Sequence, residues 1–400
     1  MDAARAVRAV RPGGRSAGHT GSVHMRKPSP TRTRPDASRA HASAAPLRIA
    51  MLAPPWISVP APGYGGVESV VSTLTEELVR GGHDVTLFCA PGSVSSAHVV
   101  TLLKRSHPDE IERSLYEVDH VAQAFDRIGS ASGAERFDVI HDHCGFTGLA
   151  MANRIATPLV HTLHGPFTAD TAAFYARHGH KAGLVGISRA QLVSAPATLG
   201  TIEPIPNPID LSIWPLEERK GDYVLWIGRM TPEKGPQRAI AAARAVDVPL
   251  ILAGVIQPGQ QAFFEREVAP HIDGKRVRFV GEVTGAAKRS LFGHARGLLM
   301  PIRWDEPFGM VMIEALACGT PVIAFREGAA PDVIVDGLTG YLVDDERGMA
   351  EAIGKLERIA GRDCRAWVSR NCDVAVVAAA YERTYRTAAL RSGSSGAAGV

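Results

Sequence analysis

Residues 297–325 read GLLMPIRWDEPFGMVMIEALACGTPVIAF, and this stretch decides the fold class of the chain. It opens with a short apolar run of strand length and closes with a second one, TPVIAF. Between them the pattern predicts a helix that begins at Gly309 and stops at Gly319, with Pro321 beyond the stop. A strand, a helix and a strand in this order form a parallel βαβ unit.

The same alternation continues along most of the chain. Short apolar runs begin with LRIAML at residue 47 and recur as VTLFCA, FDVIHDH, PLVHTLHG and GLVGIS, and a second series runs from DYVLWIG at residue 222 to GYLV. In the first predicted helix, which Gly81-Gly82 ends, apolar residues recur at helical spacing: Val67, Val70, Val71, Leu74 and Leu78. The sequence therefore predicts an α/β protein with two doubly wound, Rossmann-like domains that face each other across a cleft.

A proline-rich segment divides the two series. Residues 202–215 read IEPIPNPIDLSIWP, and their prolines are incompatible with a regular helix or a central strand. An Ala-rich stretch near the end of the chain has helical periodicity, and SGSSGAAG follows it. We therefore predict a disordered basic tail at 1–46, domains at 47–205 and 206–372, a closing helix of the first domain at about 373–390, and a flexible tail at 391–400.

Charge is unevenly distributed along the 400 residues. Residues 1–46 carry nine Lys and Arg against two Asp, whereas the whole chain has a net charge of only +3. The remainder is therefore slightly acidic, which argues against a nucleic-acid-binding face on the domains. The same Arg-rich and Ser-rich segment would also suit a transit peptide or a start codon assigned too far upstream, since Met25 and Met51 follow.

The sequence disfavours two further classes of protein. No run reaches the about 18 apolar residues of a membrane span, so no transmembrane segment is expected. The five cysteines are odd in number and lack CxxC spacing, which indicates neither a disulfide framework nor a zinc site. A reducing cytoplasm is the simplest predicted location.

Two acids bracket the start of the helix predicted after residues 297–302. Glu306 lies in the preceding turn, and Glu314 lies on the helix. The free amides of Gly309, Met310 and Val311 would face a ligand there, where the helix dipole favours a phosphate. Carboxylates suit sugar hydroxyls because each accepts charge-assisted hydrogen bonds. The alternative is that Glu306 caps the helix and Glu314 is solvated.

A second cluster, GRMTPEKG, follows the strand predicted at DYVLWIG. Gly228 would allow a close approach of the backbone, and Arg229 and Lys234 would place two cations at the carboxyl end of the sheet. Cations at this position would stabilise the negative charge that develops on a leaving diphosphate. The alternative is an ordinary surface turn with both side chains in solvent.

A pair of glycines precedes the first predicted helix. Gly65 and Gly66 would leave bare amides at a helix N-terminus that also faces the cleft. They match neither the GxGxxG dinucleotide fingerprint nor a P-loop, because no Gly-Lys-Ser/Thr follows.

Histidines gather on two neighbouring predicted strands. His141 and His143 share one face of a strand, and His161 and His164 lie on the next. A metal site is conceivable, but no third ligand has suitable spacing, which favours hydrogen-bonded structural histidines and no metal site. His164 differs because a Gly-Pro turn ends its strand at the cleft edge, and we expect it to contact substrate.

Together these motifs resemble the family 4 retaining glycosyltransferases. The resemblance covers about residues 47–390 and is carried by EPFGMVMIEALACGTPVIA with its Glu-x7-Glu spacing, GRMTPEKG, TLHG, YGGVE, PNPID and GLTGYLV. It implies the GT-B fold, with an acceptor-side first domain and a second domain that binds a nucleotide-sugar donor. The chain departs from the family at two positions, where Pro208 replaces the usual glycine and Asp332 the usual glutamate.

The resemblance also implies a role for individual residues. Arg229 and Lys234 would bind the donor diphosphate, Glu306 the transferred sugar, Glu314 the ribose, and the segment around Val283 the base. The residues expected at the donor site are Gly65, Gly66, Arg229, Lys234, Val283, Glu306, Phe308, Gly309, Met310, Val311 and Glu314, and those expected in catalysis are Glu306, His164, Arg229 and Lys234.

The expected activity is transfer of a hexose with retention of configuration, from a nucleotide sugar to a small-molecule or glycan acceptor. UDP-glucose is favoured over GDP-mannose as donor, the nucleotide sugar being a substrate, and neither a cofactor nor a metal ion is expected. A nucleotide-sugar epimerase with the same fold and a non-catalytic nucleotide-sugar binding protein are the alternatives. The sequence indicates neither the acceptor nor an oligomeric state.

Overall fold

The structure is a computed structural model that describes residues 45–63, 65–111 and 113–396, with side chains up to Arg391. The predicted disordered tail lies outside these residues except for its last two positions, and so do residues 397–400 of the predicted flexible tail. Among the helices described, none is both long and apolar enough to cross a membrane.

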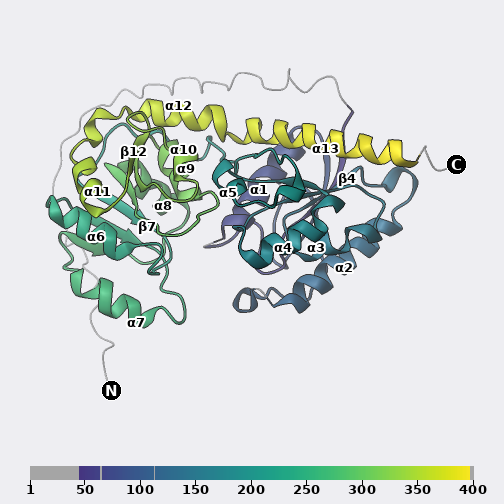
Figure 1. Ribbon diagram of the computed structural model, residues 1–400, viewed down its shortest axis with the longest axis horizontal. Helices are drawn as coiled ribbons and strands as arrows, with labels where there is room; N and C mark the ends of the chain where they lie inside the picture. Colours follow the sequence, from purple (N-terminus) through teal and green to yellow (C-terminus); the bar gives the residue numbers. More distant parts are fainter. Residues whose placement is uncertain (1–44, 64, 112, 397–400) are drawn as a thin grey trace, which may run out of the picture. The chain divides into compact units, whose positions relative to one another are not determined.

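Two parallel six-stranded sheets organise the chain (Figure 1). The first has the order β3-β2-β1-β4-β5-β6, with strands at Arg48–Leu52 (β1), Asp84–Cys89 (β2), His98–Thr101 (β3), Val139–Asp142 (β4), Leu159–Thr162 (β5) and Gly183–Val185 (β6). The second has the order β12-β11-β10-β7-β8-β9, with strands at Val224–Ile227 (β7), Leu250–Ala253 (β8), Val277–Phe279 (β9), Gly297–Met300 (β10), Val322–Phe325 (β11) and Gly340–Val343 (β12).

The helices alternate with these strands as the sequence pattern predicts. Those that follow strands of the first sheet are Gly66–Arg80 (α1), Ser114–Ser130 (α2), Thr147–Met151 (α3), Ala169–His178 (α4) and Arg189–Val193 (α5). Those that accompany the second sheet are Pro236–Ala245 (α6), Gln261–Phe263 (α7), Gly285–His294 (α8), Met310–Ala317 (α9), Ala330–Val333 (α10), Glu346–Ile353 (α11) and Gly361–Asn371 (α12), and Val374–Gly396 (α13) ends the described chain.

Each sheet is covered on both faces, which explains why its strands are continuous apolar runs. On β1, Ile49 and Met51 belong to one core cluster with residues of α1 and α13, whereas Ala50 and Leu52 belong to another with residues of α2. Successive side chains of a strand point to opposite faces, so this division follows from the period of two. The prediction of two doubly wound α/β domains is confirmed.

The predicted closing helix is present as α13, which packs against α1, β4 and β5. Tyr381 and Tyr385 are fully buried in the core of the first sheet. The helix begins at Val374 and continues to Gly396, further than the pattern predicts. Between Leu199 and Val224, where every residue is described, the chain forms single β-bridges but no regular strand or helix, in keeping with its prolines.

One strand escapes the sequence pattern. β3 is a short edge strand whose ends, His98 and Thr101, are exposed. Its four residues therefore give neither an apolar run nor a clear alternation.

Candidate functional site

A cavity of about 1160 Å³ is lined by residues that follow strands of both sheets. This volume exceeds the range of roughly 300–1,000 Å³ that is typical for a single small ligand, so the cavity has room for two substrates. Ten of the predicted site residues line it: Gly65, Gly66, His164, Arg229, Lys234, Glu306, Phe308, Gly309, Met310 and Val311. The structure therefore brings together most of the residues that the sequence motifs single out.

The two cations of the GRMTPEKG segment are not an ordinary exposed turn. Lys234 pairs with Glu306, and only 14% and 15% of these two side chains is exposed. Trp304 donates from its ring nitrogen to Glu306 Oε2 over 3.1 Å, and Lys234 Nζ lies 4.7 Å from the centroid of the same ring. Arg229 donates to Gln257 Oε1 over 3.3 Å. Side chains thus hold both cations at the cavity wall, and the solvent-exposed alternative is wrong.

The helix start at Gly309 is open toward the cavity. Gly309 is the N-cap of α9 with φ +82°, a left-handed conformation, and within the described residues no side chain caps this helix start. The positive φ favours glycine at this position, and a Cβ would also displace the flexible ends of Met312 and Met300, which would lie 2.8 and 2.9 Å from it. The first amides of α9 are therefore free of a side-chain cap, as an anion site at a helix N-terminus requires.

Glu314 is buried on α9, with 7% of the residue exposed, so the alternative of a solvated side chain is wrong. Its Oε1 accepts a hydrogen bond from Lys288 Nζ of α8 over 2.7 Å, and its buried Oε2 has no hydrogen-bond partner within the described residues. Glu314 and Val283 do not line the cavity. Since α8 begins two residues after Val283, the Lys288 pair links Glu314 to that neighbourhood. Their ribose and base roles stay predictions.

The glycine pair at the start of α1 divides into two roles. A Cβ on Gly65 would lie 2.5 Å from that of Ala61 and 2.9 Å from Glu68 Oε2, so packing requires glycine there. Gly66 has open space where a Cβ would be and lines the cavity. Burial raises the pKa of Glu68, whose carboxyl group lies beside this helix start.

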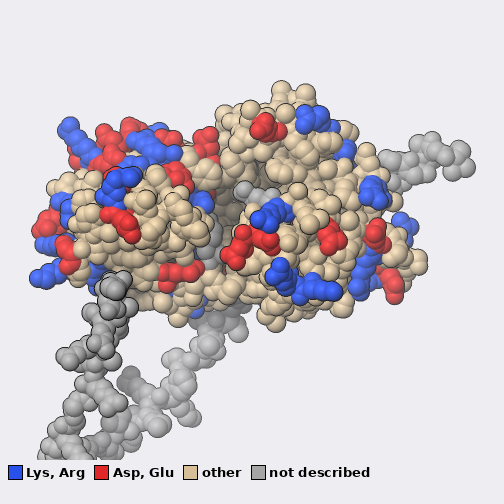
Figure 2. Space-filling view, turned by 90° about the horizontal axis from the view of Figure 1, so that it is seen from below, with Lys and Arg blue, Asp and Glu red and all other residues tan. Residues whose placement is uncertain are grey.

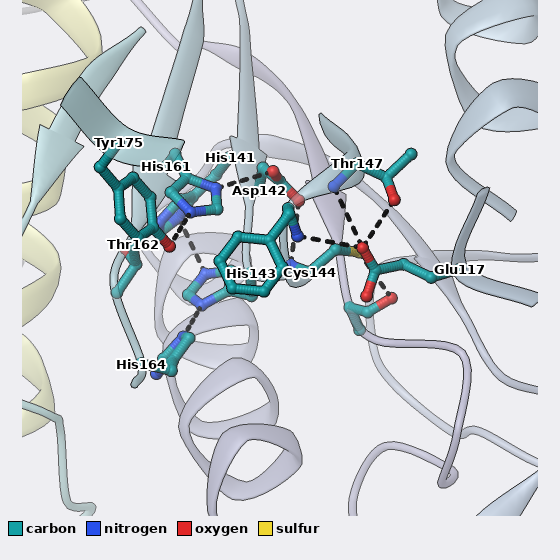
Figure 3. Close-up of polar contacts among 12 residues, drawn as sticks. Glu117, His141, Asp142, His143, Cys144, Thr147, His161, Thr162, His164 and Tyr175 are labelled. Carbon is teal, nitrogen blue, oxygen red and sulfur yellow. Dashed lines mark hydrogen bonds and ion pairs between the residues drawn. The ribbon is translucent and has the colours of Figure 1, made fainter. Parts of the chain in front are cut away.

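The histidines form a hydrogen-bonded chain that reaches the cavity (Figure 3). His143 Nδ1 lies 2.9 Å from His164 Nε2, His143 Nε2 lies 3.2 Å from His141 Nδ1, and His141 Nε2 lies 2.8 Å from Thr162 Oγ1. Burial lowers the pKa of His141 and His143, and lowers that of His164 to about 3. The rings are therefore neutral at pH 7. Within the described part of the chain, no three His, Cys, Asp or Glu residues gather in a way that could hold a metal ion.

The fourth histidine belongs to a separate network. His161 Nδ1 lies 2.8 Å from Asp142 Oδ2, and its Nε2 lies 3.4 Å from the hydroxyl group of Tyr175, which lines the cavity (Figure 3). Asp142 also accepts a hydrogen bond from the backbone of Cys144 over 2.9 Å. The histidines that the sequence placed on neighbouring strands thus serve as buried hydrogen-bonding groups, and His164 alone of the four predicted positions has the partial exposure expected of a substrate contact.

Several cavity residues were not predicted. They include Trp56, Glu117, Phe146, Tyr175, Asn207 and Trp304. Asn207 is 6% exposed, and its buried Oδ1 lacks a hydrogen-bond partner among the residues described. It belongs to the PNPID segment, which indicated the linker but gave no sign that this side chain lines the cavity. The unusual Asp332 does not line the cavity, and instead accepts a hydrogen bond from the backbone of Ala190 in α5 over 2.8 Å.

Comparisons with known proteins identify the family of the chain. Residues 64–212 match the family model Glycosyltransferase Family 4, and residues 212–380 match Glycosyl transferases group 1. A phosphatidyl-myo-inositol mannosyltransferase from Mycolicibacterium smegmatis is 31% identical over 78% of this chain and 85% of its own length. The chain is a family 4 glycosyltransferase of the GT-B fold. This establishes that the glycosyltransferase is an enzyme of the EC 2.4 class.

Two further relatives place the glycosyltransferase within a varied group. A D-inositol 3-phosphate glycosyltransferase from Acidothermus cellulolyticus is 27% identical over 82% of this chain and 87% of its own length. The crystal structure of AviGT4, a glycosyltransferase involved in avilamycin A biosynthesis, is 26% identical, covers 86% of this chain and 98% of its own, and superposes with a TM-score of 0.64. The names of these relatives differ in substrate, so family membership alone does not identify the acceptor.

Proposed function

We propose that this glycosyltransferase transfers a hexose from a nucleoside diphosphate sugar, with UDP-glucose as the first donor to test, to a small-molecule or glycan acceptor. The observation that carries the proposal is the presence of Arg229, Lys234 and the uncapped start of α9 in the wall of one cavity. A diphosphate placed there would meet two cations and free backbone amides.

The same groups account for catalysis. Cleavage of the bond between sugar and phosphate leaves negative charge on the diphosphate, and Arg229 and Lys234 would stabilise that charge as it develops. Glu306 would accept hydrogen bonds from hydroxyl groups of the transferred sugar, while Trp304 and Lys234 fix its position. We propose that no metal ion is needed, since these cations and the helix start perform the neutralisation that a divalent ion performs elsewhere.

We further propose that the anomeric configuration is retained, as the family resemblance implies. In this mechanism the acceptor attacks the face of the sugar from which the diphosphate leaves, through an oxocarbenium-like state. The leaving phosphate would help to deprotonate the acceptor hydroxyl group. The choice of glucose rests on the resemblance of the motifs, and the mannosyltransferase relative makes a mannose donor the second to test.

A thermal-shift screen with UDP, GDP, ADP and their sugars tests the proposal. A ligand at 100 times its Kd stabilises a protein by about 2.7 kcal/mol, so the true donor and its nucleotide should raise Tm more than the other bases do. UDP and UDP-glucose are expected to give the largest shift. If GDP and GDP-mannose give the largest shift in Tm, GDP-mannose replaces UDP-glucose as the proposed donor. If no nucleotide shifts Tm, the proposal of a nucleotide-sugar site is contradicted.

A further inference from the structure

The half of the cavity that belongs to the first sheet differs in charge from the half that belongs to the second. Among the described residues that line the cavity, every Lys and Arg comes from the second half, namely Arg229 and Lys234. The acidic residues that the first half contributes are Glu117 and Glu68, and burial raises the pKa of Glu68. Its lining histidines, His143 and His164, have pKa values lowered by burial and bring no positive charge at neutral pH.

Glu117 is held in a fixed orientation at this wall (Figure 3). It projects from α2, and its Oε1 accepts three hydrogen bonds, from the backbone amides of Phe146 and Thr147 over 3.1 Å each and from the hydroxyl group of Thr147 over 2.7 Å. Its Oε2 makes no hydrogen bond within the described residues. One carboxylate oxygen is therefore used in structure, and the other remains available as an acceptor.

The same half carries apolar surface that no part of the described chain covers. Phe146 is 44% exposed and Ile111 48% exposed, although both line the cavity. Phe146 packs edge-on against Phe174, with ring centroids 5.0 Å apart, and lies 5.9 Å from the ring of Tyr175. A rigid aromatic wall inside a concave site is typical of a contact surface for an apolar ligand or the face of a sugar ring.

A third observation indicates the polarity of the ligand. Asn207 lines the cavity, is 6% exposed, and has a buried Oδ1 without a hydrogen-bond partner in the described chain. A buried oxygen of this kind is costly unless a donor reaches it. Glu117 Oε2 and Asn207 Oδ1 are both acceptors, and both suit the hydroxyl groups of a ligand rather than the oxygens of a phosphate.

We propose that the acceptor is a phosphate-free, uncharged alcohol with an apolar or sugar-ring face, which packs against Phe146 and Ile111 and donates a hydroxyl hydrogen bond to Glu117 Oε2. The inference rests on the proposed transferase function and names the substrate class of its second site. It separates this enzyme from relatives whose names specify phosphatidyl-myo-inositol or D-inositol 3-phosphate. A phosphate group bound to this half would lie near carboxylates and would find no Lys or Arg to pair with among the described residues that line it. Repulsion between these negative charges would weaken the binding of a phosphorylated acceptor.

A matched pair of probes tests the acceptor class. We would titrate the full-length protein, in the presence of UDP, with 4-nitrophenyl β-D-glucopyranoside and with its 6-phosphate, and measure binding by calorimetry. The uncharged probe should bind at least about tenfold more tightly than its phosphate, since the two differ only in the group that this wall disfavours. Equal or tighter binding of the phosphate would overturn the proposal, as would the failure of both probes to bind while UDP still binds.

A variant of the wall provides a second readout. Glu117→Gln keeps one oxygen for the three structural donors but replaces the second oxygen with an NH2 group. The affinity for the uncharged probe should therefore fall roughly fivefold, and the ratio of its affinity to that of the phosphorylated probe should become smaller. Glu135→Gln, an exposed acid outside the cavity, is the matched control and should change neither affinity. An unchanged probe preference in Glu117→Gln would contradict the proposed contact.

The proposed function and the acceptor inference fail in different ways. UDP binding is measured in the same samples. If the protein binds no nucleotide, the proposed donor site is contradicted. A protein that binds UDP but prefers the phosphorylated probe contradicts the acceptor class alone.

Discussion

The two halves of the chain line one cavity with opposite chemistry. The second half contributes Arg229, Lys234 and an uncapped helix start, whereas the first contributes carboxylates, neutral histidines and an aromatic wall. In a transferase the leaving diphosphate is the group whose negative charge increases during the reaction. Among the described residues that line the cavity, Lys and Arg come only from the second half, which is the side where we propose that this charge develops. On our proposal, the first half selects its ligand by shape and by hydroxyl groups.

The largest expected effect is on turnover when a cation of the second half is removed. Lys234→Ala should lower kcat/KM by the equivalent of about 2–4 kcal/mol, because the Lys234 ammonium group is proposed to stabilise charge that is greatest in the transition state. Steady-state release of nucleotide measures the loss. Arg347→Ala is the control, since that side chain is 86% exposed and its one ion pair within the described residues is with Glu351 of the same helix. If Lys234→Ala had the kcat/KM of the parent, the positive charge of the second half would have no role in turnover, which would contradict the proposed contrast between the two halves.

The second-largest expected effect is on the free energy of unfolding, and it comes from a buried histidine of the first half. Burial lowers the pKa of His120 on α2 to about 4, from an ordinary value near 6.5. Below pH 6.5 the unfolded chain takes up a proton that the folded chain does not, so stability present at pH 7 is lost as the pH falls. Between pH 7 and 5 this one group should remove about 2 kcal/mol from the free energy of unfolding.

Urea unfolding at the two pH values, for the parent and for His120→Phe, measures that contribution. The variant should lose about 2 kcal/mol less than the parent on acidification, whatever its absolute stability. His294→Phe, an exposed histidine of the second half, is the control. If the parent and His120→Phe lose the same free energy of unfolding between pH 7 and 5, then His120 does not cause the acid-dependent loss of stability.

A smaller effect is expected from Glu314→Ala. Its buried Oε2 has no partner in the described structure and is available to a ribose hydroxyl group. Affinity for free nucleotide should therefore fall about tenfold, as when a charge-assisted hydrogen bond is lost. Calorimetry with the donor nucleotide measures it, beside Glu351→Ala as an exposed control. If nucleotide affinity stays at the parent value, Glu314 serves only as the partner of Lys288.

The smallest expected effect is that of metal removal. Turnover should be unchanged after treatment with EDTA if, as proposed, the cations and the helix start of the second half neutralise the diphosphate. Loss of activity that a single divalent metal restores would contradict this and would direct attention to the histidines and Asp142.

The fold could be predicted largely from the sequence because its signals are local. Continuous apolar runs indicate strands that are buried on both faces, and Gly309 and Gly319 mark the ends of one helix. β3 was missed because an exposed edge strand of four residues carries no such signal. The extension of α13 beyond residue 390 was missed because a Ser- and Gly-rich composition is typical of a flexible end.

The donor side was more predictable than the acceptor side for a related reason. Glu306, Gly309 and Glu314 lie on one strand–helix unit, so their spacing in sequence fixes their spacing in the fold. Glu117, Phe146 and Asn207 come from separate elements, and only tertiary packing brings them to the lining of one cavity. Neither the exposure of Phe146 nor the lack of a partner for Asn207 Oδ1 among the described residues can be deduced from neighbours in the sequence.

Glu306→Ala is the sharpest test of the proposal that the second half holds the donor and acts on its sugar in the transition state. Calorimetry with free nucleotide and steady-state turnover would be measured on the same preparation. The affinity of Glu306→Ala for free nucleotide should equal that of the parent, since Glu306 is proposed to contact the sugar and not the nucleotide. Turnover should drop about 100-fold, because the lost contact is expected to strengthen in the transition state. Normal turnover in Glu306→Ala would contradict the account and would leave Glu306 only as the partner of Lys234 and Trp304.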